Sequence, residues 1–326
     1  LVVGGVVKSL NINAVLGSGD VIVVEADEFD RSFLQLSPTY SVITNIDTDH
    51  MECYENQDDL LNAFIQFANA VPFYGAVVAC ADEPFVQQIL PDISRPVITY
   101  GLTEATDYSA SNATYHETQS DFTVKENDST LGDIRLKVPG AHNVKNALAT
   151  VALALEMNIE FDTIREALGT FTGVKRRFEI KGVFDDVMVV DDYAHHPTEV
   201  SATLRSIKNG WDRRLVTVLQ PHLFTRTREF YEDFARSLLI SDVVVVTDVY
   251  SAREDPIDGV SGKLIVNAAK SMGHEQTYWV PVKDNIVRKL TELVKPGDLV
   301  ITLGAGDIWR VCDEYVRVLQ RENVAA

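Results

Sequence analysis

Short apolar runs alternate with amphipathic segments through the first hundred residues of the chain. The runs Val21–Val24, Ser41–Thr44, Ala76–Cys80 and Val97–Tyr100 are rich in β-branched residues and have the length of buried strands. Between two of them, Asp58–Val71 places apolar residues three and four positions apart, which predicts a helix. This βαβ order is typical of a parallel sheet.

The pattern changes over residues 105–138, where short alternating segments surround Asn127-Asp128-Ser129 and Gly132-Asp133. Such segments predict antiparallel hairpins added to the sheet. Gly140 then opens a helix that we expect to run to about Met157. A glycine and a basic triplet interrupt the pattern near Phe171–Arg177, and we place a domain boundary there, between residues 1–173 and 174–326.

A second, more regular βα series fills the C-terminal domain. Its spacing predicts a Rossmann-like, doubly wound domain, so the fold class is α/β throughout. We expect helices to start near Pro197, Arg226, Val260, Lys283 and Asp307. The expected strands are Val187–Val190, Leu215–Leu219, Val243–Thr247, Tyr278–Val280 and Leu299–Leu303.

Composition narrows the class of protein. The 326 residues have room for about two domains, and 46% hydrophobic content supports ordinary cores. A formal net charge of −19 argues against nucleic acid as a partner, so any nucleotide phosphate must be held by local cations or Mg²⁺. Apolar runs of strand length predict no membrane span. Three widely spaced cysteines fit a reducing cytoplasm better than a disulfide framework.

Carboxylates and a histidine follow two neighbouring runs. Glu25 comes directly after the first run, where we expect it to be the last residue of a strand and a ligand of Mg²⁺. The next run is followed by Asp47, Asp49 and His50, and His50 would complete the Mg²⁺ site if the two strands lie side by side. The alternative for the first cluster is an acidic, solvated loop.

Two asparagines open the helix after Gly140. Asn143 and Asn146 lie three residues apart, on one face of the first turn. Their amides can donate to and accept from an adenine edge. N-capping by His142 or Asn143 is the structural alternative.

Three further clusters suit phosphate and carboxylate chemistry. At the domain junction, Arg176 or Arg177 is suited to clamp a phosphoryl group. The segment Asp191–Glu199 offers Asp192 for ribose or metal, with His195 and His196 for phosphate or proton transfer. The third cluster contains His222, Arg226 and Arg228 at an expected helix start, where arginine and the helix dipole both favour a carboxylate. Ion pairing of these arginines with Glu229 or Asp233 is the alternative.

Two glycine-rich segments are weaker signals. Gly259-Val-Ser-Gly-Lys263 lacks the first glycine and the Ser or Thr of a phosphate loop, and we expect it to cap a helix. Gly304-Ala-Gly-Asp-Ile-Trp309 has two of the three glycines of a dinucleotide fingerprint, so it favours a tight turn over NAD binding.

Taken in order, these segments resemble the Mur ligases over essentially the whole chain. The segments from Asp191 to Glu199 and from Gln220 to His222 are the most discriminating. The segments that carry the resemblance are Glu25-Ala-Asp-Glu28, Thr44-Asn-Ile-Asp-Thr-Asp-His50, His142-Asn-Val-Lys-Asn-Ala147, Arg176-Arg-Phe178, Asp191-Asp-Tyr-Ala-His-His-Pro-Thr-Glu199, Gln220-Pro-His222 and Arg226-Thr-Arg228.

The resemblance implies ATP-dependent formation of an amide through an acyl phosphate, with UDP-N-acetylmuramate and L-alanine as the substrates. By similarity, Glu25 and His50 would hold Mg²⁺, while the nucleotide would be bound by Asn143, Asn146, Arg177 and Asp192. Arg177 would contact the γ-phosphate and Asp192 the ribose. The muramyl and alanine groups would face Tyr193, His195, His222 and Arg226, with Arg226 as the partner of the alanine carboxylate. The catalytic set would then be His195, His222, Arg226 and Arg177.

One departure affects the expected activity. Mur ligases carry a phosphate loop and a UDP-binding domain upstream of the matching segments, but no Gly-x-x-x-x-Gly-Lys-Ser/Thr occurs in this sequence. We therefore expect a truncated central ATPase domain and no competent ATP turnover by this segment alone. The alternatives are a recycling ligase that adds a tripeptide to UDP-N-acetylmuramate, a non-catalytic nucleotide-binding module and, more distantly, a nicotinamide dehydrogenase.

Overall fold

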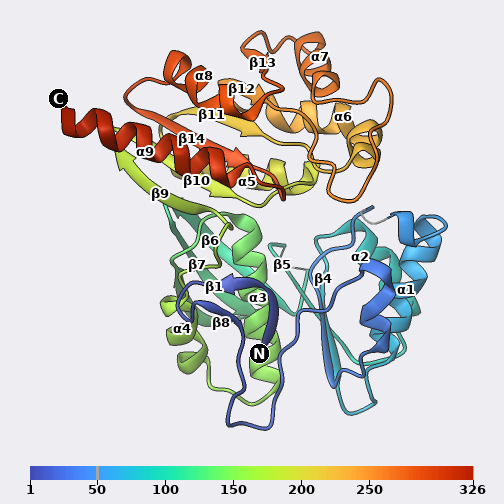
Figure 1. Cartoon of the computed structure of the whole chain (residues 1–326). Helices are drawn as coiled ribbons and strands as arrows, with labels where there is room; N and C mark the ends of the chain where they lie inside the picture. The colour runs from blue at the N-terminus through green and yellow to red at the C-terminus, as the bar shows by residue number, and fades with distance from the viewer. Residues whose placement is uncertain (49–50, 104, 326) are drawn as a thin grey trace. The chain divides into compact units, whose positions relative to one another are not determined.

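The computed structural model describes residues 1–48, 51–103 and 105–325 (Figure 1). Its contacts divide the chain into two units, Leu1–Gly173 and Val174–Ala326, and the division falls where the sequence predicts a boundary. No helix among the described residues is long and apolar enough to cross a membrane.

The first unit is built on a six-stranded sheet whose order is β3-β4-β5-β6-β7-β8. The pairs from β3 to β6 are parallel, and β6, β7 and β8 pair antiparallel, as the sequence predicts. The strands are β3 (Tyr40–Ile43), β4 (Ala76–Cys80), β5 (Val97–Gly101), β6 (Tyr108–His116), β7 (Gln119–Glu126) and β8 (Ser129–Leu136).

Helices cover both faces of this sheet. Alternate residues of β4 enter different cores, because side chains of a strand point to opposite faces: Val77 packs with α1 and α2, and Val78 with α3 and α4. The helices are α1 (Gln57–Asn69), α2 (Pro84–Ile89), α3 (Ala141–Glu156) and α4 (Phe161–Thr170), with short 3₁₀ turns η1 (Phe29–Gln35), η2 (Met51–Cys53) and η3 (Leu90–Asp92).

The strand expected at Val21–Val24 is wrong. In the described residues this run is extended and exposed, and it makes only one bridge, between Val24 and Val2. β3 pairs with β4 and not with this run, so Glu25 does not end a strand of the main sheet. A segment with high strand propensity forms a strand only where a neighbouring strand pairs with it. Here the run lies against β1 (Val2–Val7), and β1 pairs with β2 (Ile12–Ala14).

The second unit contains a six-stranded sheet of order β13-β12-β11-β14-β10-β9, parallel except for β9. This arrangement confirms the doubly wound α/β prediction. The β9–β10 hairpin was not predicted; Asp185 and Asp186 form its turn with positive φ. The strands are β9 (Glu179–Phe184), β10 (Val187–Asp192), β11 (Arg214–Leu219), β12 (Val243–Val246), β13 (Thr277–Trp279) and β14 (Asp298–Leu303).

Two apolar cores flank this sheet. Val190 and Leu219 face α5, α6 and α7, whereas Val189 and Val218 face α8 and α9. The helices are α5 (Pro197–Gly210), α6 (Phe224–Leu238), α7 (Lys263–Ser271), α8 (Ile286–Leu293), preceded by η4 (Lys283–Asn285), and α9 (Trp309–Ala325).

The two glycine-rich segments both make close turns. Gly262 directly precedes α7, and a Cβ there would stand 1.9 Å from the Thr247 carbonyl oxygen. Gly304 has φ 147°, and a Cβ would lie 2.8 Å from the Gln220 carbonyl oxygen. The tight-turn prediction for residues 304–309 is therefore confirmed.

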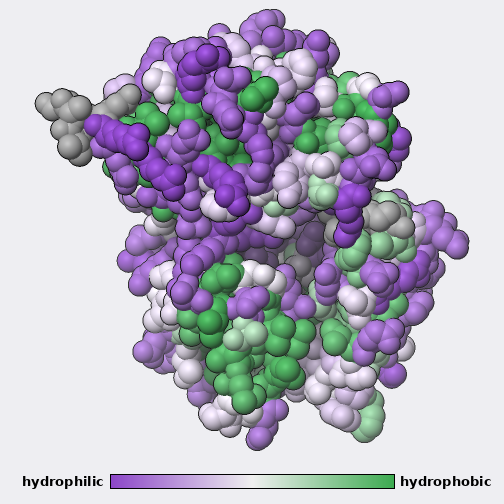
Figure 2. Space-filling view, in the orientation of Figure 1, coloured by the Kyte–Doolittle hydropathy of each residue, from purple (hydrophilic) through white to green (hydrophobic). Residues whose placement is uncertain are grey.

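Apolar residues also gather on the surface of the first unit, around β1 (Figure 2). They include exposed side chains on both strands of the β1–β2 hairpin and just beyond it, namely Val2, Ile12, Val15 and Leu16.

Candidate active site

Three strands of the second unit end together at one edge of its sheet. β10, β14 and β11 are adjacent and parallel, and Asp192 and Leu219 both pair with Leu303 in register. The segments that follow these strands therefore leave the sheet at the same edge. Ligands of open α/β sheets bind at this edge.

A row of aromatic and imidazole rings lies along that edge. Tyr193 and His195 have ring centroids 5.1 Å apart, and His195 and His222 are 5.6 Å apart. His222 in turn stacks on Tyr250, at 5.7 Å and an interplanar angle of 14°. The structure thus brings together Tyr193, His195 and His222, three of the residues expected from the sequence, and adds Tyr250.

Glu199, in the first turn of α5, ties this row to Arg177. Its Oε1 accepts from Arg177 Nη1 at 3.0 Å, and its Oε2 accepts the His195 and His196 amides at 2.9 and 3.2 Å. Burial alone would raise the pKa of the Glu199 carboxyl, but the charges of His195 and Arg177 hold that pKa below its ordinary value. The sequence signal for this role is a glutamate at the third helical position.

Asp192 is buried at the end of β10. Its Oδ1 accepts the Ala194 amide and its Oδ2 the Phe178 amide, both at 2.7 Å. Burial raises the pKa of the Asp192 carboxyl to about 6. The carboxylate therefore fixes the turn that carries Tyr193, and a contact with ribose stays a prediction.

The raised pKa of Asp192 predicts a pH dependence of stability. Between about pH 4 and pH 6 the folded chain holds this proton more tightly than the unfolded chain, so the contribution of Asp192 to stability declines as pH rises. The free energy of unfolding is measured by denaturant for wild type and for Asp192→Asn. From pH 4 to pH 7, the value for wild type should fall by about 2–3 kcal/mol relative to the value for the variant. A difference that does not vary with pH would contradict the assignment.

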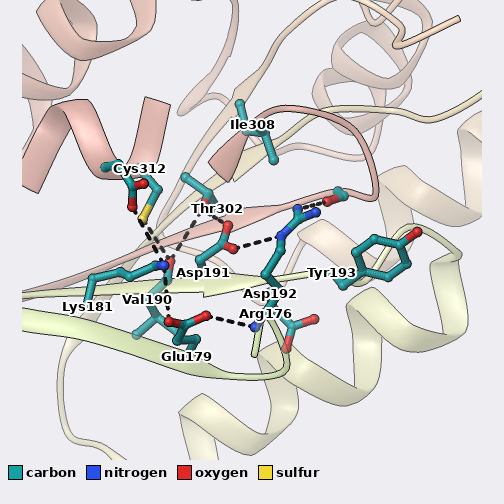
Figure 3. Close-up of polar contacts among 12 residues, drawn as sticks. Arg176, Glu179, Lys181, Val190, Asp191, Asp192, Tyr193, Thr302, Ile308 and Cys312 are labelled. Atoms are coloured by element: carbon teal, nitrogen blue, oxygen red, sulfur yellow. Dashed lines mark hydrogen bonds and ion pairs between the residues drawn. The ribbon is translucent and has the colours of Figure 1, made fainter. Parts of the chain in front are cut away.

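Arg176 joins β10 to the turn after β14 (Figure 3). Its Nε donates to Asp191 Oδ2 at 3.1 Å, and its Nη2 donates to the Gly304 carbonyl at 2.7 Å. Asp191 is fully buried, and Thr302 donates its hydroxyl to Oδ1 at 2.7 Å. The Arg176 guanidinium also lies 5.0 Å from the centre of the Tyr193 ring. Of the two junction arginines, Arg176 thus has a buried partner, and Arg177 lies farther out beside Glu199.

Arg226 and Arg228 differ in burial although both lie near the start of α6. Arg226 is only 6% exposed. The Arg228 side chain is 53% exposed and lies 3.6 Å from Glu229, while Asp233 pairs with Arg236. The surface ion pair proposed as an alternative thus applies to Arg228, and Arg226 is the buried cation of the helix start.

The adenine candidates lie on the first turns of α3. The Asn143 side chain is partly buried and donates Nδ2 to the Pro139 carbonyl at 2.7 Å, while Asn146 is exposed. Gly140, with φ 98°, precedes the helix, and Asn143 donates backward instead of accepting a helix amide. N-capping by His142 or Asn143 is therefore wrong.

The metal candidates of the first unit are only partly described. Glu25 is exposed, and its Oε2 accepts the Gly4 amide at 2.6 Å. His50 lies outside the described residues. Within residues 1–48, 51–103 and 105–325, no three His, Cys, Asp or Glu side chains are grouped closely enough to hold a metal ion by themselves.

Two family models match the chain. The Mur ligase middle domain matches residues 9–154, and the Mur ligase, glutamate ligase domain matches residues 176–306. A UDP-N-acetylmuramate–L-alanine ligase of Salinibacter ruber is 47% identical over 327 residues, covering 100% of this chain and 69% of the relative. The chain belongs to the Mur ligase family.

Solved structures of Mur ligases share this fold. A UDP-N-acetylmuramate–alanine ligase of Thermotoga maritima matches with a TM-score of 0.81 at 29% identity, over 98% of this chain and 69% of that chain. A MurF ligase of the same organism, solved in complex with ADP, matches with a TM-score of 0.69 at 18% identity, over 87% of this chain and 63% of that one. At the latter identity only the fold is comparable.

The Mur ligase matches include the candidate residues of both units. Glu25, Asn143 and Asn146 lie within the middle-domain match. The match to the other Mur ligase domain begins at Arg176 and includes Asp192 and the ring row. The candidate site of the second unit therefore lies within the residues that match a Mur ligase domain.

Proposed function

We propose that the chain functions in the ATP-dependent ligation of L-alanine to UDP-N-acetylmuramate, a step of peptidoglycan precursor synthesis. The observation that carries this proposal is the 47% identity with a ligase of that name over the whole chain. The cluster of Tyr193, His195 and His222 at the carboxyl edge of the second sheet supports it, because that edge is where such folds bind ligands.

In the proposed reaction, the muramyl carboxylate attacks the γ-phosphate of ATP and releases ADP. The resulting acyl phosphate is attacked by the amine of L-alanine, and phosphate leaves as the amide forms. Arg177, which donates to Glu199 at 3.0 Å, would stabilise charge on the transferring phosphoryl group. The buried cation Arg226 is suited to the carboxylate of L-alanine. Tyr193, His195 and His222 would orient the muramyl group and L-alanine.

The proposed partners of the adenine are two asparagines of the first unit. Asn143 and Asn146 share the first turns of α3, where amide groups can read an adenine edge. Asp192 is the proposed ribose partner, although main-chain amides already occupy one position on each of its oxygens. Each carboxylate oxygen can accept a second hydrogen bond, so the two roles are compatible.

Mg²⁺ fits the donor chemistry of the first unit. Glu25 offers an exposed carboxylate, and Mg²⁺ is commonly held by one or two carboxylates together with water and substrate phosphates. We propose Glu25 and His50 as its ligands. When bound, the ion would neutralise phosphate charge.

The proposed route is tested by isotope transfer in the natural full-length protein. UDP-N-acetylmuramate is labelled with ¹⁸O in both carboxylate oxygens and incubated with Mg-ATP and L-alanine. Because one carboxylate oxygen bridges to phosphorus in the acyl phosphate, each released phosphate should carry one label. Label in AMP would point to an adenylate instead, and amide formation with unlabelled phosphate would contradict the acyl phosphate.

A further inference from the structure

The connection between β11 and α6 has a backbone conformation that its neighbours must hold. Leu223, between His222 and the helix, has φ 68° and ψ 137°. A leucine with positive φ is uncommon and costs conformational energy, so such a residue persists where surrounding contacts impose it. The position of His222, and the start of the helix that carries Arg226, therefore depend on those contacts.

One set of contacts comes from Tyr250, in the loop after β12. The Tyr250 amide donates to the Pro221 carbonyl at 2.8 Å, and the Leu223 amide donates to the Tyr250 carbonyl at 3.0 Å. These two hydrogen bonds lie on either side of His222, whose ring stacks on Tyr250. A Cβ on Gly306 would come within 2.6 Å of the Tyr250 ring, so this glycine leaves room for it.

A second set of contacts comes from Glu254, farther along the same loop. Its Oε2 accepts the amides of Phe224 and Thr225, the latter at 3.1 Å, and its Oε1 accepts the Thr225 hydroxyl. The first amides of a helix have no partner within the helix, and a carboxylate at that end also interacts favourably with the helix dipole. Glu254 thus satisfies two such amides from about thirty residues away in sequence.

We propose that Glu254 is a positioning residue for the amino donor. Its hydrogen bonds stabilise the first turn of α6 and the strained conformation of Leu223, and they thereby determine the positions of His222 and Arg226. Glu254 does not contact the amino donor itself. The inference rests on the proposed function, since that function assigns His222 and Arg226 to the alanine side of the reaction.

The test compares KM values in the natural full-length protein. Glu254→Ala should raise the KM for L-alanine about tenfold, because three hydrogen bonds at the helix start are lost, and should change the KM for ATP and UDP-N-acetylmuramate by less than about twofold. Glu254→Gln should stay within about threefold of wild type, since its amide oxygen can accept both helix amides and its NH₂ can donate to the Thr225 hydroxyl. Asp255→Asn, at the exposed neighbouring position, is the matched control and should resemble wild type.

A second readout does not depend on the activity. Hydrogen exchange of the amides of residues 224–227 should be about tenfold faster in Glu254→Ala than in wild type. Thr225→Val keeps the two hydrogen bonds from the helix amides to Glu254 and loses only the hydroxyl contact, so it should give an intermediate rise in the KM for L-alanine. If Glu254→Ala is too unstable to assay, Thr225→Val replaces it in the comparison.

The outcomes separate the two proposals. Wild-type enzyme that shows no L-alanine-dependent turnover contradicts the proposed function, whatever the exchange rates. An active wild type with an unchanged KM for L-alanine in Glu254→Ala overturns the positioning role. A Gln variant as impaired as the Ala variant also overturns it, because the retained hydrogen bonds to the start of α6 would then not position the amino donor.

Discussion

Replacing Arg226 by alanine should lower kcat/KM for L-alanine by about a hundredfold or more in the natural full-length enzyme. Arg226 is a buried cation in the first turn of α6. Removing one partner of a buried, charge-assisted interaction typically costs ~2–5 kcal/mol, which corresponds to this loss. The measurement is steady-state phosphate release at varied L-alanine.

Arg228→Ala is the control for this prediction. It lies two residues farther along the same helix, with its side chain exposed and 3.6 Å from Glu229. Surface pairs contribute little, so this variant should stay within about threefold of wild type. Equal losses in the two variants would show that the effect is not specific to the carboxylate site, and an unchanged Arg226→Ala would remove Arg226 from it.

Replacing Arg176 by alanine should destabilise the second unit by about 3 kcal/mol or more. Asp191 is fully buried beside it, and the loss of the guanidinium leaves this carboxylate with the Thr302 hydroxyl at 2.7 Å but without the cation that pairs with it at 3.1 Å. Burial already raises the pKa of Asp191, and loss of the cation raises it further. The variant should therefore recover part of its stability at low pH, where Asp191 takes up a proton. Denaturant unfolding at several pH values measures both effects.

Arg236→Ala gives the comparison on the same unit. Its side chain is exposed and pairs with Glu232 and Asp233 at 3.1 and 2.9 Å. We expect a loss of less than about 1 kcal/mol, with little dependence on pH. A loss for Arg176→Ala as small as this would mean that the Arg176–Asp191 pair does not support the strand edge.

The parallel cores were predictable because their signal is local. Val187–Val190 and Val243–Val246 are apolar runs rich in β-branched residues, and both form buried parallel strands with paired neighbours. The same rule failed at Val21–Val24, whose composition is equally apolar, because a strand also needs a partner and this run bridges only to Val2 among the described residues. Apolar composition therefore predicts a buried strand only where a neighbouring strand can pair with it.

The site was predictable only in part, for a different reason. Tyr193, His195 and His222 follow strand ends, and parallel strand ends converge, so their proximity could be inferred. Glu199 had a local signal, since a glutamate at the third helical position can accept the amides that precede the helix, and that signal was overlooked. Glu254 was missed because the main-chain amides that it accepts lie some thirty residues away in sequence. A carboxylate in a loop gives no sequence signal of the helix end that it will contact.

The first measurement for the ligase function is phosphate release from Mg-ATP and UDP-N-acetylmuramate, using the natural full-length protein with L-alanine or the tripeptide as donor. An L-alanine ligase should release phosphate only when L-alanine is present, with one phosphate for each amide formed. Preference for the tripeptide would move the chain to the recycling reaction. Nucleotide binding without release for any donor would contradict the ligase function and favour a binding module.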